Sequence, residues 1–236
     1  GQILHNHDHS GTLREGQLLL IDSGAESPGG YAGDITRTYP VTGRFDARQK
    51  AVYETVLRAQ KEAIAACVPG RPFREIHLLA ARVLAEGLRE IGLIRGAVED
   101  VVAEGAHALF FPHGLGHMNG MDVHDMEGLG EQRVGYAPDM ERSGQFGLAY
   151  LRLARPLQEN FVVTVEPGLY FIPALIGQWQ AERRHEAFIR YDLLADWLDF
   201  GGVRIEDDVW IRAEGPHVLG PAIPKEPEDI AAALGR

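Results

Sequence analysis

The chain carries, at residues 18–41, the stretch LLLIDSGAESPGGYAGDITRTYPV. Its first half is an apolar run that ends in Asp22, and turn residues around Pro28 lead into a second run rich in Thr and Tyr. This pattern predicts strands over residues 18–25 and 34–41 that fold back on each other. A simple hairpin about Pro28 places Asp22 opposite Asp34, with Cβ atoms about 5 Å apart. A bulge near Gly33 would shift that register by one residue.

Facing carboxylates repel each other, so this hairpin needs a cation nearby. Two later apolar runs also meet an acid, because Glu166 follows residues 161–165 and Glu206 lies in a strand predicted over residues 203–212. Taken singly, each acid is explained by a capped strand end or a salt bridge. Burying several unpaired carboxylates is very costly, however. Four strand acids and His117 therefore predict a site for two divalent ions, with two carboxylates bridging them.

His117 lies in a glycine-rich loop, residues 113–125, that reads HGLGHMNGMDVHD. Three histidines in this loop are spaced by glycines, which let a backbone approach a ligand closely. The HxxxH spacing is not the helical zinc-protease motif, because Gly114 and Gly116 oppose a helix and no Glu follows His113. The loop is therefore expected to carry much of the chemistry.

Helical patterns fill much of the remaining chain. Asp46 is a plausible N-cap for a helix that ends at Pro69-Gly70, and an apolar stripe from Ile76 to Ile91 predicts a second helix closed by Gly92. A third helical segment is expected over residues 173–200. The tail after Pro216 shows no clear periodicity.

Composition narrows the class of protein. The chain has 236 residues, which suits one α/β domain, and a net charge of -11 with no Lys/Arg cluster, which argues against a nucleic-acid partner. Two divalent ions would change that charge from -11 to -7, although acidic surfaces also simply aid solubility. Cys67 is the only cysteine, so a reducing, cytoplasmic compartment is expected. No apolar run is long enough to span a membrane, and the N-terminus lacks a signal-peptide pattern.

Six segments together resemble one known family. They are IDSG at 21–24, GDITRTYP at 33–40, HGLGH at 113–117, DVHD at 122–125, TVEPGLYF at 164–171 and GGVRIEDD at 201–208. They resemble the pita-bread metallopeptidases, which include methionine aminopeptidase, aminopeptidase P, prolidase and the metal-free creatinase, and look most like the two proline-specific branches. The resemblance runs from His5 to about Val209. It implies an α+β fold, with a curved, mostly antiparallel sheet covered by helices and pseudo-twofold halves around a dinuclear metal site.

The resemblance also assigns roles to residues. The implied metal ligands are Asp22, Asp34, His117, Glu166 and Glu206, with Asp22 on one ion, His117 and Glu166 on the other, and Asp34 and Glu206 bridging. The implied catalytic residues are His113, His124 and Glu166, and the implied substrate-binding residues are His5, His124 and Arg204. Hard carboxylate ligands favour two Mn²⁺ ions, although Co²⁺ or Zn²⁺ could substitute.

The implied activity is hydrolysis of the peptide bond before a proline, by a water that bridges the metals. The segments 146–156 and 173–200 resemble the dipeptidase branch, and Arg204 could hold the free carboxylate of a dipeptide; the GDITRTYP wording is nearer the aminopeptidase branch. We favour a dipeptidase, with an aminopeptidase on longer peptides as the alternative. A non-catalytic peptide- or histone-binding module, and a metal enzyme without proline preference that acts on other N-terminal residues or phosphate triesters, are further alternatives.

Three positions depart from the family pattern, namely Asn6, Met118 and Asn119, and these are expected near the substrate pocket. Residues 1–236 are expected to form a single catalytic domain without the first helix and the N-terminal domain of relatives. A homodimer or higher homo-oligomer is expected as well.

Overall fold

A computed structural model describes residues 3–4 and 10–235 of the chain. His5, an expected substrate-binding residue, and Asn6 lie outside the described residues. The strands are β1 (Leu18–Glu26), β2 (Ala32–Pro40), β3 (Val162–Val165), β4 (Gly168–Tyr170), β5 (Gly202–Arg204), β6 (Asp207–Arg212) and β7 (Gly215–Val218). The α-helices are α1 (Ala47–Ala65), α2 (Phe73–Glu90), α3 (Val98–Ala103), α4 (Glu131–Gly135), α5 (Pro173–Ala181), α6 (Tyr191–Leu194) and α7 (Pro227–Ala233), and short 3-10 turns lie at Ala106–Leu109, Glu127–Leu129, Leu148–Tyr150 and Ala195–Trp197.

The β1–β2 hairpin forms as predicted, but in a different register. Asp22 lies opposite Thr36, and Asp34 lies opposite Gly24. The predicted pairing of Asp22 with Asp34 is therefore wrong by two residues, and the pairing is continuous with no bulge at Gly33. The reason is the loop, in which Ser27 and Tyr31 are bridged by a backbone hydrogen bond of 2.8 Å, so that the chain turns about residue 29. The two aspartates remain diagonal neighbours on one face of the hairpin.

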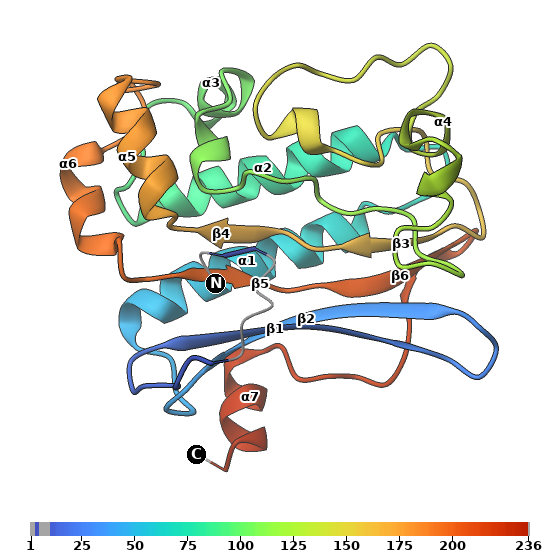
Figure 1. Cartoon of the computed structure of the whole chain (residues 1–236), viewed down its shortest axis with the longest axis horizontal. Coiled ribbons are helices and arrows are strands. Elements are labelled where there is room, and N and C mark those ends of the chain that lie inside the picture. The colour runs from blue at the N-terminus through green and yellow to red at the C-terminus, as the bar shows by residue number, and fades with distance from the viewer. Residues whose placement is uncertain (1–2, 5–9, 236) are drawn as a thin grey trace.

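The first two helices form the core as the sequence predicts. The Asp46 side chain caps α1 by accepting from the backbone N–H of Gln49, which completes a capping box. The apolar stripes of α1 and α2 are buried against each other. In Figure 1 these helices run across the strands, and α1 contacts β3, β4 and β5. The helices thus form a layer that supports the strands of the site.

The strands that bear the two glutamates are both interrupted. β3 and β4 pair with β6 and β5 in one shared antiparallel register, with Val165 opposite Asp207 and Gly168 opposite Arg204. Glu166 and Glu206 occupy facing positions in the gap between these ladders. The strand predicted over residues 203–212 is therefore broken at Glu206, whose backbone N–H donates to Thr36 O at 3.0 Å instead of to a ladder partner. At these interruptions Glu166 and Glu206 lie outside the regular hydrogen-bonded pairing of the strands.

The helix predicted over residues 173–200 is wrong in its middle. Helix α5 ends at Ala181, and Arg183 and His185 adopt left-handed backbone conformations before the chain resumes at α6. Residues 93–95 hold this segment, because the Arg95 side chain donates to the carbonyls of Glu186 and Ala187 and the Arg95 backbone N–H donates to Phe188 O. These bonds hold the segment as turns and override its helical propensity.

The C-terminal tail contains β7 and α7, which the sequence did not predict. The tail is attached to the core by Lys225, whose Nζ lies 2.6 Å from Asp207 Oδ2 and 3.0 Å from Gln60 Oε1. Arg37 contacts the other oxygen of Asp207 at 2.7 Å. In the described part of the chain, no helix is both long and apolar enough to cross a membrane.

His77 is a fully buried histidine in α2. Neither ring nitrogen has a hydrogen-bond partner within residues 3–4 and 10–235, and the ring stacks on Phe111 with centroids 5.2 Å apart. Burial lowers the pKa of His77 from 6.5 to about 3. The folded protein therefore keeps this ring neutral, whereas the unfolded chain binds a proton as the pH falls below 6.5.

Replacing His77 with Phe should therefore reduce the loss of stability in acid. The contribution of a neutral buried His77 is complete above about pH 7 and is lost as the pH falls, by about 2 kcal/mol between pH 7.5 and pH 5. Denaturant unfolding at both pH values measures it: His77→Phe should lose about 2 kcal/mol less than wild type over this interval. His217→Phe, at an exposed histidine, is the control and should follow wild type. Equal losses in wild type and His77→Phe would contradict this account.

Candidate metal centre and active site

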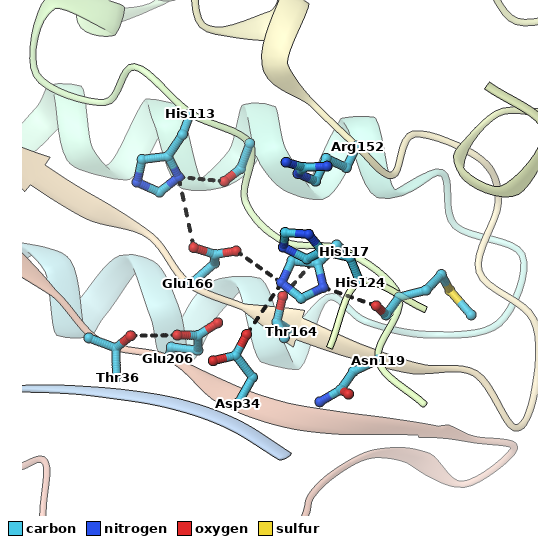
Figure 2. A network of polar contacts seen from close by, with 12 residues as sticks. Asp34, Thr36, His113, His117, Asn119, His124, Arg152, Thr164, Glu166 and Glu206 are labelled. Carbon is cyan, nitrogen blue, oxygen red and sulfur yellow. Dashed lines mark hydrogen bonds and ion pairs between the residues drawn. The ribbon is translucent and has the colours of Figure 1, made fainter. Parts of the chain in front are cut away.

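The predicted site residues line one cleft of about 510 Å³. Its walls include all five expected metal ligands together with His113, His124 and Arg204. The side chains come from β1, β2, the loop before β3, the β3–β4 gap and the β5–β6 gap. Figure 2 shows how most of them point toward a common point. The structure thus gathers residues that are up to 184 positions apart, from Asp22 to Glu206.

Three of the expected ligands form the tightest group. Asp34, His117 and Glu206 each offer one donor atom, and these atoms all lie within 4.8 Å of one another. Glu166 joins them, because its Oε1 lies 3.7 Å from His117 Nε2. Asp22, the diagonal neighbour of Asp34 on the hairpin, contacts Arg204 at 2.5 Å. The arrangement offers carboxylates and one imidazole around a shared space.

The loop that bears His117 runs beside β3 like an added strand. Thr164 N donates to His117 O at 3.0 Å, and Glu166 N donates to Leu115 O at 2.8 Å. A Cβ atom at Gly116 would lie 2.0 Å from Thr164 O, so only glycine allows this approach. The sequence suggested that these glycines admit a ligand; at Gly116 the close neighbour is the backbone of β3.

The ring of His117 has a defined tautomer. Its Nδ1 lies 2.9 Å from Met118 O, and a carbonyl only accepts, so Nδ1 carries the proton. Nε2 then faces Asp34 Oδ2 at 3.5 Å and Glu166 Oε1 at 3.7 Å. Burial disfavours a charged ring, but these carboxylates outweigh it and raise the pKa of His117. An imidazole fixed in this way is typical of a metal ligand.

Three carboxylates of the cleft have pKa values shifted from their ordinary range. Burial, reinforced by Glu166 and Asp34, raises the pKa of Glu206 well above its ordinary value. Burial also raises the pKa of Glu166, although His117 and Arg204 oppose the shift. For Asp34 burial acts in the same direction, but His117 and Arg204 outweigh it and lower its pKa. Protein groups alone do not neutralise the cluster.

Arg204 is buried, and each nitrogen of its guanidinium donates one hydrogen bond to a neighbouring side chain. Nη2 donates to Asp22 Oδ2 at 2.5 Å, Nη1 donates to Tyr170 Oη at 3.1 Å, and Nε donates to Thr36 Oγ1 at 3.1 Å. The side chain is 4% exposed. These bonds use one N–H on each nitrogen, whereas a guanidinium carries five, so the contact of Arg204 with a substrate carboxylate stays a prediction. The arrangement fits a role in positioning Asp22 and its neighbours.

His113 connects to the same network through Tyr170. Its Nδ1 lies 2.7 Å from Gly114 O, which assigns the proton to that nitrogen, and its Nε2 lies 2.9 Å from Tyr170 Oη. Burial raises the pKa of Tyr170 to about 12, so the phenol is protonated at neutral pH and can donate to Nε2. His113 Nδ1 also lies 4.0 Å from Glu166 Oε2.

His124 and a row of ion pairs form the mouth of the cleft. The His124 ring packs edge-on against His117 with centroids 4.3 Å apart, and its side chain is 42% exposed. Glu127 lies next to both His124, at 3.8 Å, and Arg152 Nη1, at 2.5 Å. Arg152 and Arg142 therefore add cations to the cleft wall that the sequence did not single out.

Sequence reasoning also missed residues that support the ligands from behind. Asp208 accepts from the backbone N–H of Asp34 at 3.0 Å and from Asn119 Nδ2 at 2.6 Å. Asn119 is thus buried beside the site, and Met118, which follows His117 in the chain, lines a separate apolar groove. Tyr170 and Thr36 lie within the motifs GLY and TRT, but their roles require tertiary contacts that no spacing reveals.

The donor set fits divalent cations. Asp34, Glu166 and Glu206 supply hard oxygen ligands, and His117 offers a nitrogen whose lone pair faces them. Burial is the main cause of the raised pKa values of Glu166 and Glu206, and neighbouring acids add to it. Bound cations would favour the ionised forms of these acids.

Comparison with known proteins connects this cleft with a family. The chain matches the model of metallopeptidase family M24 over residues 1–213. It is 39% identical to human Xaa-Pro dipeptidase over 98% of this chain and 46% of that protein. It is 38% identical to a probable Xaa-Pro aminopeptidase of Verticillium alfalfae over 96% of this chain and 47% of that protein. The chain therefore spans about half the length of the curated relatives it matches.

Solved structures agree with these relatives. Proline aminopeptidase P II from Yersinia pestis superimposes with a TM-score of 0.77 at 38% identity, over 99% of this chain and 45% of that one. Zinc-substituted Escherichia coli aminopeptidase P in complex with product gives 0.76 at 34% identity, over 99% and 44%. The likeness confirms the expected pita-bread fold, with antiparallel strands covered by helices. By sequence and by structure, the chain belongs to metallopeptidase family M24.

Proposed function

We propose that this chain carries the catalytic site of a metal-dependent peptidase that hydrolyses the bond before a proline, acting as an Xaa-Pro dipeptidase. The observation that carries the proposal is the convergence of Asp34, His117 and Glu206, whose donor atoms lie within 4.8 Å of one another at the base of a cleft. Relatives named Xaa-Pro dipeptidase and Xaa-Pro aminopeptidase support the reaction class.

The expected ligands Asp22, Asp34, His117, Glu166 and Glu206 would hold two divalent ions in this cleft. When bound, such ions lower the pKa of water and polarise a carbonyl oxygen. Glu166 then moves the proton from the attacking water toward the leaving proline nitrogen, which must be protonated to depart. Its Oε2 lies 4.0 Å from His113 Nδ1. We assign the donation to the substrate carbonyl to His124, and we assign His113 a catalytic role through its contacts with Tyr170 and Glu166.

The choice of dipeptidase rests on the cations of the cleft. A dipeptide ends in a free carboxylate directly after the proline, which a forked guanidinium binds well. Each nitrogen of Arg204 already donates to a neighbour, whereas the ion pairs of Arg152 with Glu127 and Glu131 both use Nη1, and the Arg152 side chain lines the cleft and is 38% exposed. Figure 2 shows Arg152 beside the space above His117 and Glu166. We assign the carboxylate contact to Arg152 in place of Arg204.

An Xaa-Pro aminopeptidase acting on longer peptides is the second candidate. It is favoured by the solved structures, since those with TM-scores of 0.76 and 0.77 cited above are aminopeptidases P. Manganese as the native metal follows from the hard ligand set. A cytoplasmic location is proposed from the single buried cysteine, Cys67, and a homodimer or higher homo-oligomer from the family resemblance.

Rates on three peptides test the activity and separate the candidates. With Mn²⁺ present, a dipeptidase hydrolyses Ala-Pro faster than Ala-Pro-Gly and leaves Met-Ala intact, because its cleft holds a carboxylate after the proline. Preference for Ala-Pro-Gly would instead establish the aminopeptidase. Turnover of Met-Ala would contradict proline specificity, and no turnover of any peptide by metal-loaded protein would contradict the enzyme itself.

Replacing Glu206 with Gln should weaken metal binding and abolish turnover. The variant keeps the shape of the side chain but removes one of the charges that would bridge the ions, so we expect a loss of at least about 100-fold in kcat. Isothermal titration with Mn²⁺ and steady-state rates measure both effects. In EDTA the variant should unfold at the same temperature as wild type or higher, because repulsion with Glu166 and Asp34 is relieved. Two bound ions with full turnover would overturn the site.

Replacing Arg152 with Met should impair dipeptides selectively. Losing a charge-assisted contact with the carboxylate should lower kcat/KM for Ala-Pro roughly 10- to 100-fold, with a smaller effect on Ala-Pro-Gly. Arg142→Met is the matched control in the same cleft, because the Arg142 guanidinium is already bound by Ala149 O and Glu131. Equal losses on both peptides for Arg152→Met would remove Arg152 from this role without touching the reaction class.

A further inference from the structure

Thr36 in β2 holds Glu206 by two hydrogen bonds. Its carbonyl oxygen accepts from the backbone N–H of Glu206 at 3.0 Å, and its Oγ1 lies 2.5 Å from Glu206 Oε2. Thr36 is completely buried, and Glu206 is 2% exposed. The contact connects two different ladders, since β2 pairs with β1 whereas Glu206 lies between β5 and β6. The hydrogen bonds that hold Glu206 here therefore come from β2, a strand of another ladder.

The direction of each bond follows from counting protons. A threonine hydroxyl has one proton and can accept from other donors. Arg204 Nε lies 3.1 Å from Thr36 Oγ1 and can only donate, so it uses an acceptor position of the hydroxyl. The single proton is therefore directed at Glu206 Oε2. The two hydrogen bonds therefore run in one direction, from Arg204 Nε to the Thr36 hydroxyl and from that hydroxyl to the Glu206 carboxylate.

We infer that Thr36 is a positioning residue for the metal centre, which orients the Glu206 carboxylate and keeps the Arg204 guanidinium apart from it. The inference rests on the proposed function, because it assumes that Glu206 binds the ions. Ligating carboxylates held by hydrogen bonds lose less freedom when a cation binds. The Thr36 hydroxyl, and not the bulk of its side chain, therefore increases the affinity of the centre for metal.

Removing the hydroxyl has two consequences for the centre. Glu206 loses the donor that fixes Oε2, so its carboxylate can rotate away from the position that a cation requires. Arg204 Nε loses its acceptor while Glu166 Oε2 lies only 4.0 Å away. A guanidinium that moves onto that carboxylate competes with the cation for the same oxygen. Both effects weaken metal binding in the same direction.

Three variants test the inference. Thr36→Val keeps the shape and removes the hydroxyl, whereas Thr36→Ser keeps the hydroxyl and removes the methyl group. Thr38→Val is the matched control, because Thr38 is equally buried on the same strand but its hydroxyl bonds to the backbone of Arg204, at 2.9 Å and 3.2 Å, and not to a carboxylate of the described residues. The readouts are Mn²⁺ dissociation constants from titration calorimetry and unfolding temperatures in EDTA.

We expect Thr36→Val to weaken Mn²⁺ binding about 10- to 100-fold. Thr36→Ser and Thr38→Val should stay within about threefold of wild type, even if all three unfold at lower temperature. Equal Mn²⁺ affinity in Thr36→Val and wild type would overturn the inference, and so would an equal loss in Thr36→Ser. If wild type itself binds no Mn²⁺, the proposed function fails first, so the two failures are distinguishable.

Discussion

Repulsion among buried carboxylates is the constraint around which this site is organised. Asp34 in β2 and the interstrand residues Glu166 and Glu206 converge, with Asp22 beside them, and Arg204 contacts both Asp22 and Glu166. Two like unit charges 4 Å apart cost about 4 kcal/mol even at an effective dielectric constant of 20. The elevated pKa values of Glu206 and Glu166 express this cost, since burial and neighbouring acids both disfavour their ionised forms. Divalent cations would convert the repulsion into attraction.

The fold keeps the acids together by breaking its own ladders. Glu166 and Glu206 face each other where β3–β6 gives way to β4–β5, and neither acid is committed to regular pairing. β2 supplies hydrogen bonds where the ladders are interrupted, because the Thr36 hydroxyl donates to the Glu206 carboxylate and the Thr38 hydroxyl donates to Arg204 O. Gly116 permits the loop of His117 to lie against β3. Local irregularity in the strands is thus the means by which the site is built.

Much of this could be predicted from the sequence, and the failures share a cause. Acids after apolar runs and glycine-spaced histidines indicated residues that the fold gathers in one cleft, because local patterns record burial and backbone approach. Register, in contrast, depends on how the loop at Ser27–Tyr31 closes, and a shift of two residues moved Thr36 opposite Asp22. The hydrogen bonds of Arg204 with Asp22, Tyr170 and Thr36 could not be predicted, because these partners are remote in sequence. Residues 182–188 form turns for the same reason, since they contact Arg95, which is remote in sequence.

Anomalous diffraction at the manganese edge, from crystals of the chain grown with Mn²⁺, tests the central claim most directly. The account predicts two peaks about 4 Å apart in the cleft, both within coordination distance of Asp34 and Glu206, and one of them in contact with His117. A cleft without anomalous signal, or manganese bound only where these three side chains do not reach it, would contradict the account.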